Sequence, residues 1–242
     1  MPRRLLPVVL TGLTLALAAC GSSGSSSSSS APAATATTTA STATTAATTA
    51  AAPATAANGC RTVDAQAPVK KKSAKPTTKL PASAKAVVTL QTSCGEIQIT
   101  LDAKDHPVTA SSFASLVKSG FYDGLGVVRV VPGFVLQAGD PHGDGTGGAS
   151  YQVVEPPGDN AAYRQGVVAM AKTGSDPAGA SSSQFFIVTG ADAGLPPEYA
   201  IAGRVTKGLD VAKAIGAIPP TNGQDGPPSQ PVLIEKATLS VK

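Results

Sequence analysis

The 242-residue sequence predicts a mainly β fold, a closed β-barrel with two α-helices, preceded by a disordered tether. From about residue 86 onward, short apolar runs alternate with loops rich in Gly, Pro and Asp, and only two segments have helical spacing. Many short strands with few helices are typical of a closed barrel, because closure leaves no unpaired strand edge. Residues 21–57 are almost entirely Ser, Thr, Ala, Gly and Pro, so they offer no bulky side chain to bury.

The first predicted element of the domain is a β-hairpin. Val88 and Leu90 alternate with polar neighbours, and Cys94-Gly95 supplies a turn. Apolar and polar residues alternate again over 97–101, a period of two that marks a half-buried strand.

Two helices and a series of further strands follow. The first helix is expected to begin near Pro107, which suits a first helical turn, and Gly120 suits its C-terminal cap. The second helix is expected over about 209–215. The remaining short strands are predicted at 127–131, 134–138, 166–170, 184–188, 200–205 and 232–241.

Basic residues are concentrated before the domain. The net charge of +4 comes from 19 basic and 15 acidic residues, but nine of the basic ones and only one acid precede residue 86. Residues 86–242 carry 10 basic and 14 acidic side chains, a net charge of −4. A nucleic-acid-binding domain would carry its basic charge on the fold itself, so we expect no nucleic-acid partner. The expected regions are a signal peptide at 1–19, a disordered tether at 20–85 and the globular domain at 86–242.

The N-terminus has the pattern of a targeting segment. Arg3 and Arg4 precede an apolar stretch, 5–19, that is too short to span a bilayer comfortably. It ends in Leu-Ala-Ala before Cys20, which is similar to a bacterial lipobox. We therefore expect an extracytoplasmic lipoprotein, anchored to the bacterial cell membrane through lipid on Cys20. The alternative is an ordinary secretory signal cut near Ala19, and the mature chain is exported in either case.

Two more cysteines, Cys60 and Cys94, remain. In an oxidising compartment such a pair is a candidate disulfide, and two free thiols are the alternative. Three cysteines and two histidines show no zinc-ligand spacing. The run 139–145 partly resembles a calcium loop, but it lacks the closing glutamate and the flanking helices. We therefore expect no metal.

One run of the domain combines a charge, an aromatic ring and an amide. Residues 127–140 read VVRVVPGFVLQAGD, which places Arg129 in an apolar strand just before a Pro-Gly turn, with Phe134 and Gln137 after the turn. An unpaired guanidinium inside an apolar stretch is costly. The run therefore predicts either a hairpin whose arginine reaches the surface or a hydrophobic pocket with an arginine at its rim.

Three motifs together resemble the cyclophilin-type peptidyl-prolyl isomerases. They are RVVPGF at 129–134, GTGG at 145–148 and SSSQFFIV at 181–188, in the family's order and at sensible spacings. The resemblance covers roughly residues 86–242. It implies an eight-stranded antiparallel β-barrel capped by two helices. It also implies peptidyl-prolyl cis-trans isomerase (rotamase) activity, which requires no cofactor.

The resemblance assigns roles to nine residues. Arg129 would donate to the twisted amide, Phe134 would wall the proline pocket, and Gln137 would hold the substrate backbone. The substrate-binding residues would be Val135, Ala171, Lys172, Phe186, Leu195 and Tyr199. Of these, Ala171 and Lys172 would offer main-chain groups that pair with the peptide like an added strand. For Phe186 alone, plain core packing is the alternative.

Five positions depart from common members of the family. Val128, next to Arg129, stands where histidine is common. Val135 stands where methionine is common, Lys172 where asparagine is common, and Tyr199 where histidine is frequent. Gly194 stands where some members have a tryptophan used in binding cyclosporin, so weaker inhibition is expected.

Two functions fit these residues. The first is an isomerase acting on proline-containing segments of exported proteins, as a monomer. The second is a proline-peptide-binding module or holdase chaperone that uses the same groove without essential turnover. The combination of Arg129, Phe134 and Gln137 favours the isomerase, because a pure binder has no need of a guanidinium aimed at a twisted amide.

Overall fold

The computed structural model describes residues 59–242. The predicted signal peptide, Cys20 and the tether as far as residue 58 lie outside the described residues. None of the helices in the described part of the chain is long and apolar enough to cross a membrane.

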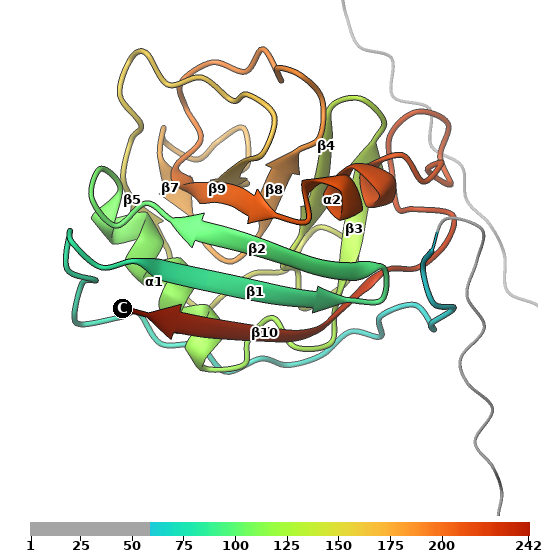
Figure 1. The fold of residues 1–242 in the computed structure, drawn as a ribbon, viewed down its shortest axis with the longest axis horizontal. Coiled ribbons are helices and arrows are strands. Elements are labelled where there is room, and N and C mark those ends of the chain that lie inside the picture. The colour runs from blue at the N-terminus through green and yellow to red at the C-terminus, as the bar shows by residue number, and fades with distance from the viewer. Residues whose placement is uncertain (1–58) are drawn as a thin grey trace, which may run out of the picture. The chain divides into compact units, whose positions relative to one another are not determined.

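Eight antiparallel strands close into a barrel (Figure 1). Around the barrel their order is β1-β10-β3-β4-β8-β6-β9-β2, which confirms the predicted eight-stranded closed barrel. The barrel strands are β1 (Ala86–Thr92), β2 (Gly95–Leu101), β3 (Leu125–Val131), β4 (Val135–Ala138), β6 (Val167–Met170), β8 (Phe185–Val188), β9 (Ile201–Lys207) and β10 (Leu233–Val241). A separate two-stranded sheet, β5 (Val153–Val154) with β7 (Ala180–Ser181), was not predicted from the sequence.

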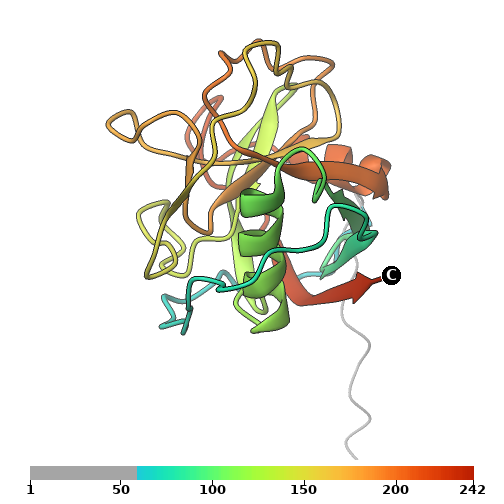
Figure 2. The same ribbon diagram turned by 90° about the vertical axis from the view of Figure 1, so that its left-hand side faces the viewer.

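Two helices complete the domain at the expected places. Helix α1 (Pro107–Lys118) has its proline in the first turn, and Gly120 follows its end with φ of 70°. It lies in front of the barrel in Figure 2 and packs on β10 and β9. Helix α2 (Leu209–Gly216) packs instead on β2, β4 and β3. The two helices therefore cover different parts of the barrel.

The barrel strands separate an interior core from a second apolar cluster. On β8, Phe185 lies in the interior, with ring centroids 5.2 Å from Phe113 and 5.5 Å from Tyr122. The next residue, Phe186, belongs to the other cluster, together with Val135 and Tyr163. This division follows from the alternation of side chains along a strand, which points neighbours to opposite faces of the sheet.

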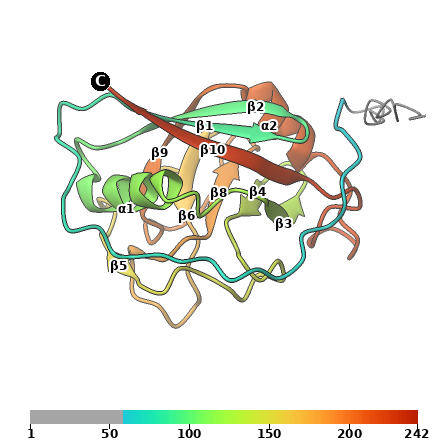
Figure 3. The ribbon, with the colours of Figure 1, turned by 90° about the horizontal axis from the view of Figure 1, so that it is seen from below.

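Residues 59–85, which we call the strap, run along the underside of the barrel (Figure 3). The side-chain amide of Gln66 donates to the carbonyls of Asp140 (2.9 Å) and Pro141 (3.0 Å) and accepts from the backbone N–H of Gly126. Farther along, the N–H of Leu80 donates to Ser111 Oγ at 2.7 Å. The composition of the strap predicts a flexible linker, and the structure differs. The reason is that polar contacts scattered along the strap, together with the packing of Leu80 on the barrel core, hold it to the domain.

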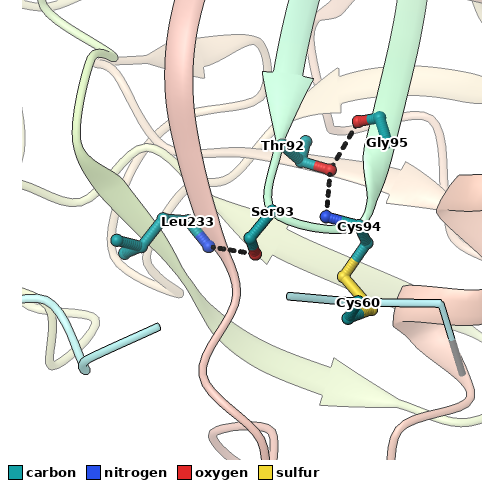
Figure 4. Close-up of a disulfide and its surroundings, with 6 residues drawn as sticks. All are labelled: Cys60, Thr92, Ser93, Cys94, Gly95 and Leu233. Atoms are coloured by element: carbon teal, nitrogen blue, oxygen red, sulfur yellow. Dashed lines mark hydrogen bonds between the residues drawn. A yellow bond between two sulfur atoms is a disulfide. The ribbon is translucent and has the colours of Figure 1, made fainter. Parts of the chain in front are cut away.

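A disulfide joins the start of the strap to the first hairpin. Cys60 is fully buried and is bonded to Cys94, in the turn between β1 and β2 (Figure 4). Thr92 Oγ1 donates to Gly95 O and accepts from Cys94 N–H, which fixes the turn. The disulfide joins the two cysteines that the sequence analysis names as a candidate pair.

Candidate active site

Pairing between four neighbouring strands places the key polar and apolar side chains in one row. Arg129 on β3 is opposite Gln137 on β4, Gln137 is opposite Phe186 on β8, and Phe186 is opposite Ala169 on β6. The β3–β4 register shifts between Val127 and Arg129, just before this row begins. Residues far apart in the sequence therefore share one face of the sheet, outside the barrel interior.

A cavity of about 260 Å³ opens over this row. It is lined by all nine residues that the resemblance assigns to the site: Arg129, Phe134, Val135, Gln137, Ala171, Lys172, Phe186, Leu195 and Tyr199. Apolar side chains form its floor, since Val135 and Phe186 are buried and Leu195 packs on them. The arrangement is an apolar pocket with a guanidinium among its lining groups.

Arg129 makes a two-point contact with an acid that lies outside the predicted site. Its Nε donates to Asp225 Oδ1 at 2.6 Å, and its Nη2 donates to Asp225 Oδ2 at 2.8 Å. These hydrogen bonds lower the pKa of the Asp225 carboxyl and raise that of the Arg129 guanidinium, although burial acts on both in the opposite direction. Arg129 therefore stays charged, and one edge of its planar group is held.

Gln137 is oriented by a second glutamine. Its Nε2 donates to Gln184 Oε1 at 2.7 Å. Gln184 Nε2 in turn donates to the carbonyls of Gly145 and Gly147, both at 2.8 Å. The chain of bonds explains why the GTGG loop and the SSSQFFIV strand occur together with Gln137: the first holds Gln184, and Gln184 holds Gln137.

The Pro132-Gly133 turn carries Phe134 to the pocket and is fixed from behind. The carbonyl of Phe134 accepts the N–H groups of Thr189 (2.9 Å) and Gly190 (3.0 Å). A Cβ at position 190 would lie 1.9 Å from the carbonyl oxygen of Gly133, so only glycine permits this approach. The backbone carrying Phe134 is therefore held independently of the phenyl ring.

An aromatic cluster supports the far wall. Phe186 and Tyr199 have ring centroids 5.5 Å apart, nearly perpendicular to each other. The hydroxyl of the buried Tyr163 donates to Tyr199 O (2.7 Å) and accepts from Tyr199 N–H (2.9 Å). Burial raises the pKa of Tyr163, so its hydroxyl keeps the proton it donates.

Lys172 contributes its side chain as well as its backbone. Only 6 % of the side chain is exposed, and Nζ lies 3.1 Å from Glu198 Oε2 and 5.6 Å from the centre of the Tyr199 ring. The neighbouring Ala171 donates its own N–H to Gln184 O at 2.9 Å, just beyond the paired residues of β6 and β8. The main-chain pairing expected for a bound peptide is thus limited to the other backbone groups of these two residues.

The family model described as "Cyclophilin type peptidyl-prolyl cis-trans isomerase/CLD" matches residues 87–239. The chain belongs to the cyclophilin-type peptidyl-prolyl cis-trans isomerases. Peptidyl-prolyl cis-trans isomerase B of Bacillus subtilis is 42% identical over 119 residues, 49% of this chain and 81% of that protein. Peptidyl-prolyl cis-trans isomerase ppi1 of Schizosaccharomyces pombe is 39% identical over 158 residues, covering 63% of this chain and 97% of the relative.

Solved structures agree with this assignment. A cyclophilin-type isomerase of Cryptosporidium parvum, crystallised in the presence of the dipeptide Ala-Pro, superposes with a TM-score of 0.58 at 26% sequence identity. The match covers 64% of this chain and 98% of that structure. The expected family, fold and isomerase activity are thereby confirmed.

Three residues that support the site escaped prediction from the sequence. Gln184 lies inside the recognised SSSQFFIV motif, so the motif itself was a signal for it. Tyr163 and Asp225 lie in loops without periodicity, and no sequence signal links either to the pocket.

The run 139–145, which only partly resembles a calcium loop, forms hydrogen bonds within itself. Ligand atoms of Asp140, His142 and Asp144 lie within 4.8 Å of one another. The buried Asp140 carboxylate accepts backbone N–H groups from His142, Asp144 and Gly145, at 2.6 to 3.0 Å. These bonds hold the start of the loop whose later carbonyls bind Gln184.

Proposed function

We propose that this isomerase accelerates X-Pro rotation non-covalently, with Arg129 as hydrogen-bond donor to the twisted amide. The barrier to be lowered is about 18–20 kcal/mol, because the C–N bond has partial double-bond character. Rotation breaks that resonance and makes the imide nitrogen more basic, so a cationic donor stabilises the transition state more than the ground state. A thousandfold acceleration requires only about 4 kcal/mol.

The observation that carries the proposal is the position of the guanidinium. Arg129 lines the same cavity as Phe134, Val135, Phe186 and Leu195, and its charged group is held at one edge only. A proline ring among these apolar side chains would bring its amide near the remaining N–H groups. Gln137, oriented by Gln184, supplies a second polar group for the substrate backbone.

The substrates we propose are proline-containing segments of exported proteins. The support is the sequence alone: a basic n-region, an apolar stretch and a lipobox-like ending before Cys20. In this proposal lipid on Cys20 anchors the enzyme at the bacterial cell membrane, and the tether that follows lets the domain reach newly exported chains. Mass spectrometry of the N-terminal peptide from membrane-extracted protein tests the anchor, and an unmodified Cys20 would contradict it.

A protease-coupled isomerisation assay on a short X-Pro peptide tests the mechanism. Arg129→Ala should lose most of the turnover of the unchanged enzyme while keeping its circular dichroism spectrum, because Arg129 is 37 % exposed and its loss leaves no cavity in the core. Lys207→Ala, which removes an exposed cation paired with Glu96, is the matched control and should keep full turnover. Near-normal turnover of a folded Arg129→Ala protein would refute the arginine-assisted mechanism.

A further inference from the structure

We propose that Asp225 is a positioning residue of this isomerase, holding the Arg129 guanidinium in the orientation that donates to the substrate amide. This inference rests on the proposed role of Arg129. Asp225 is separated from Arg129 by 96 residues of sequence and lies outside every motif that identifies the family in this chain.

The contact is two-pointed and therefore directional. A guanidinium carries five N–H donors in one plane. The side-on pair through Nε and Nη2 occupies two of them, at 2.6 and 2.8 Å, and fixes the plane as well as the distance. Both N–H groups of Nη1 and one of Nη2 remain for a substrate. A single-point contact would leave the plane free to rotate about the hydrogen bond.

The fold places Asp225 at Arg129 by backbone pairing, not by chance approach of two long side chains. The next residue, Gly226, forms an isolated antiparallel bridge with Val130, the residue after Arg129. Val130 N–H donates to Gly226 O at 2.8 Å. This backbone bridge holds the loop between α2 and β10 against the middle of β3, beside Arg129. Asp225 has a short side chain, so little rotamer freedom separates its backbone from its carboxylate.

The exposure of the Arg129–Asp225 pair favours a role in turnover over a role in stability. The side chains of Arg129 and Asp225 are 37 % and 54 % exposed, and exposed ion pairs contribute little to stability. The orientation of the guanidinium can affect the rate strongly, because a small misplacement of a catalytic group can cost up to about a hundredfold in rate. Removing Asp225 should therefore alter turnover much more than folding.

A competing role for the Asp225 carboxylate would predict the opposite result. If the carboxylate competed with the substrate for the guanidinium, its removal would free Arg129 and raise turnover. The geometry favours positioning, since the carboxylate binds the Nε edge and leaves the whole of Nη1 unoccupied by it.

The test compares Asp225→Ala, Asp225→Asn and Arg129→Ala with the unchanged protein in a protease-free NMR exchange assay, over a range of X-Pro peptide concentrations. Asp225→Ala should lower kcat about tenfold, equivalent to about 1.4 kcal/mol, and leave KM within about twofold. Asp225→Asn retains one acceptor oxygen and should lose less. Glu96→Gln, which weakens the exposed pair with Lys207 away from the pocket, is the matched control and should keep normal kcat.

A second readout follows Arg129 itself. Its Nε–H signal should exchange faster with water in Asp225→Ala and stay unchanged in Glu96→Gln, which shows that the guanidinium has lost its partner. A pair that only stabilised the fold would give the same exchange but would leave kcat unchanged. Unchanged or increased kcat in Asp225→Ala, or a loss confined to KM, overturns the inference. If Arg129→Ala is inactive in that case, only the positioning role fails; if Arg129→Ala is active, the arginine mechanism fails with it.

Discussion

Breaking the Cys60–Cys94 disulfide is expected to lower the free energy of unfolding by about 3–4 kcal/mol. The bridge closes a loop with a sequence separation of 34 residues. In the chain-entropy model a loop of this length restricts the unfolded chain by about that amount at 25 °C. For a domain of 150–250 residues, each kcal/mol shifts Tm by about 2–4 °C, so the loss should be about 6–16 °C.

Thermal unfolding of the oxidised protein, the reduced protein and a Cys60→Ser/Cys94→Ser double variant measures this loss. Reduction alone is the matched control for the substitutions, because Cys60 is fully buried and a serine hydroxyl there would add a cost of its own. The barrel should remain folded in all three, since its strands are paired without the strap. The chain-entropy model attributes the stabilisation to the restricted unfolded chain. A reduced protein whose Tm falls by less than about 2 °C would refute that explanation.

Three further predictions concern the pocket and its supports. Gly190→Ala should destabilise the domain by about 1–3 kcal/mol in urea unfolding, because its Cβ would meet Gly133 O, whereas Gly174→Ala, with open space around it, should cost far less. Gln184→Ala should lower kcat/KM about tenfold through the loss of the bond to Gln137, and unchanged activity would exclude that role. Cyclosporin should inhibit more weakly, by about 1–3 kcal/mol, than it inhibits a family member with tryptophan in place of Gly194; equal affinity in an inhibition titration would reject this.

The barrel was predictable because its signals are local. The alternation over 97–101, the proline at the start of α1 and the glycine after its end each act within a few residues. The pocket was predictable for a different reason: the motifs around Arg129 and Phe186 identify a family whose fold brings them together. Neither alternation nor composition would have placed those two residues on one row.

The strap was the part that local signals misjudged. Its Pro, Lys and Ala content is typical of a solvated linker, and most of its side chains are exposed in the structure. What orders it is a covalent bond at one end and scattered polar contacts such as that of Gln66 with Gly126. Such contacts depend on where the barrel presents its carbonyl and N–H groups. The sequence of residues 59–85 does not predict the positions of those groups.

Asp225 illustrates the same limit at the site itself. The costly arginine inside an apolar run implied that Arg129 needs a partner, and fourteen acids in the domain could have met that need. The choice is made by the bridge between Val130 and Gly226, which depends on β10 and β3 being neighbours in the barrel. The sequence around Arg129 therefore predicts that the arginine needs a partner. Which acid becomes the partner depends on the closed barrel. In a chimera whose α2–β10 loop keeps Asp225 but cannot form the backbone bridge between Gly226 and Val130, Asp225 should separate from Arg129. The kcat of this chimera should then fall as it does in Asp225→Ala. Full activity in the chimera would mean that the bridge is not what positions the pair.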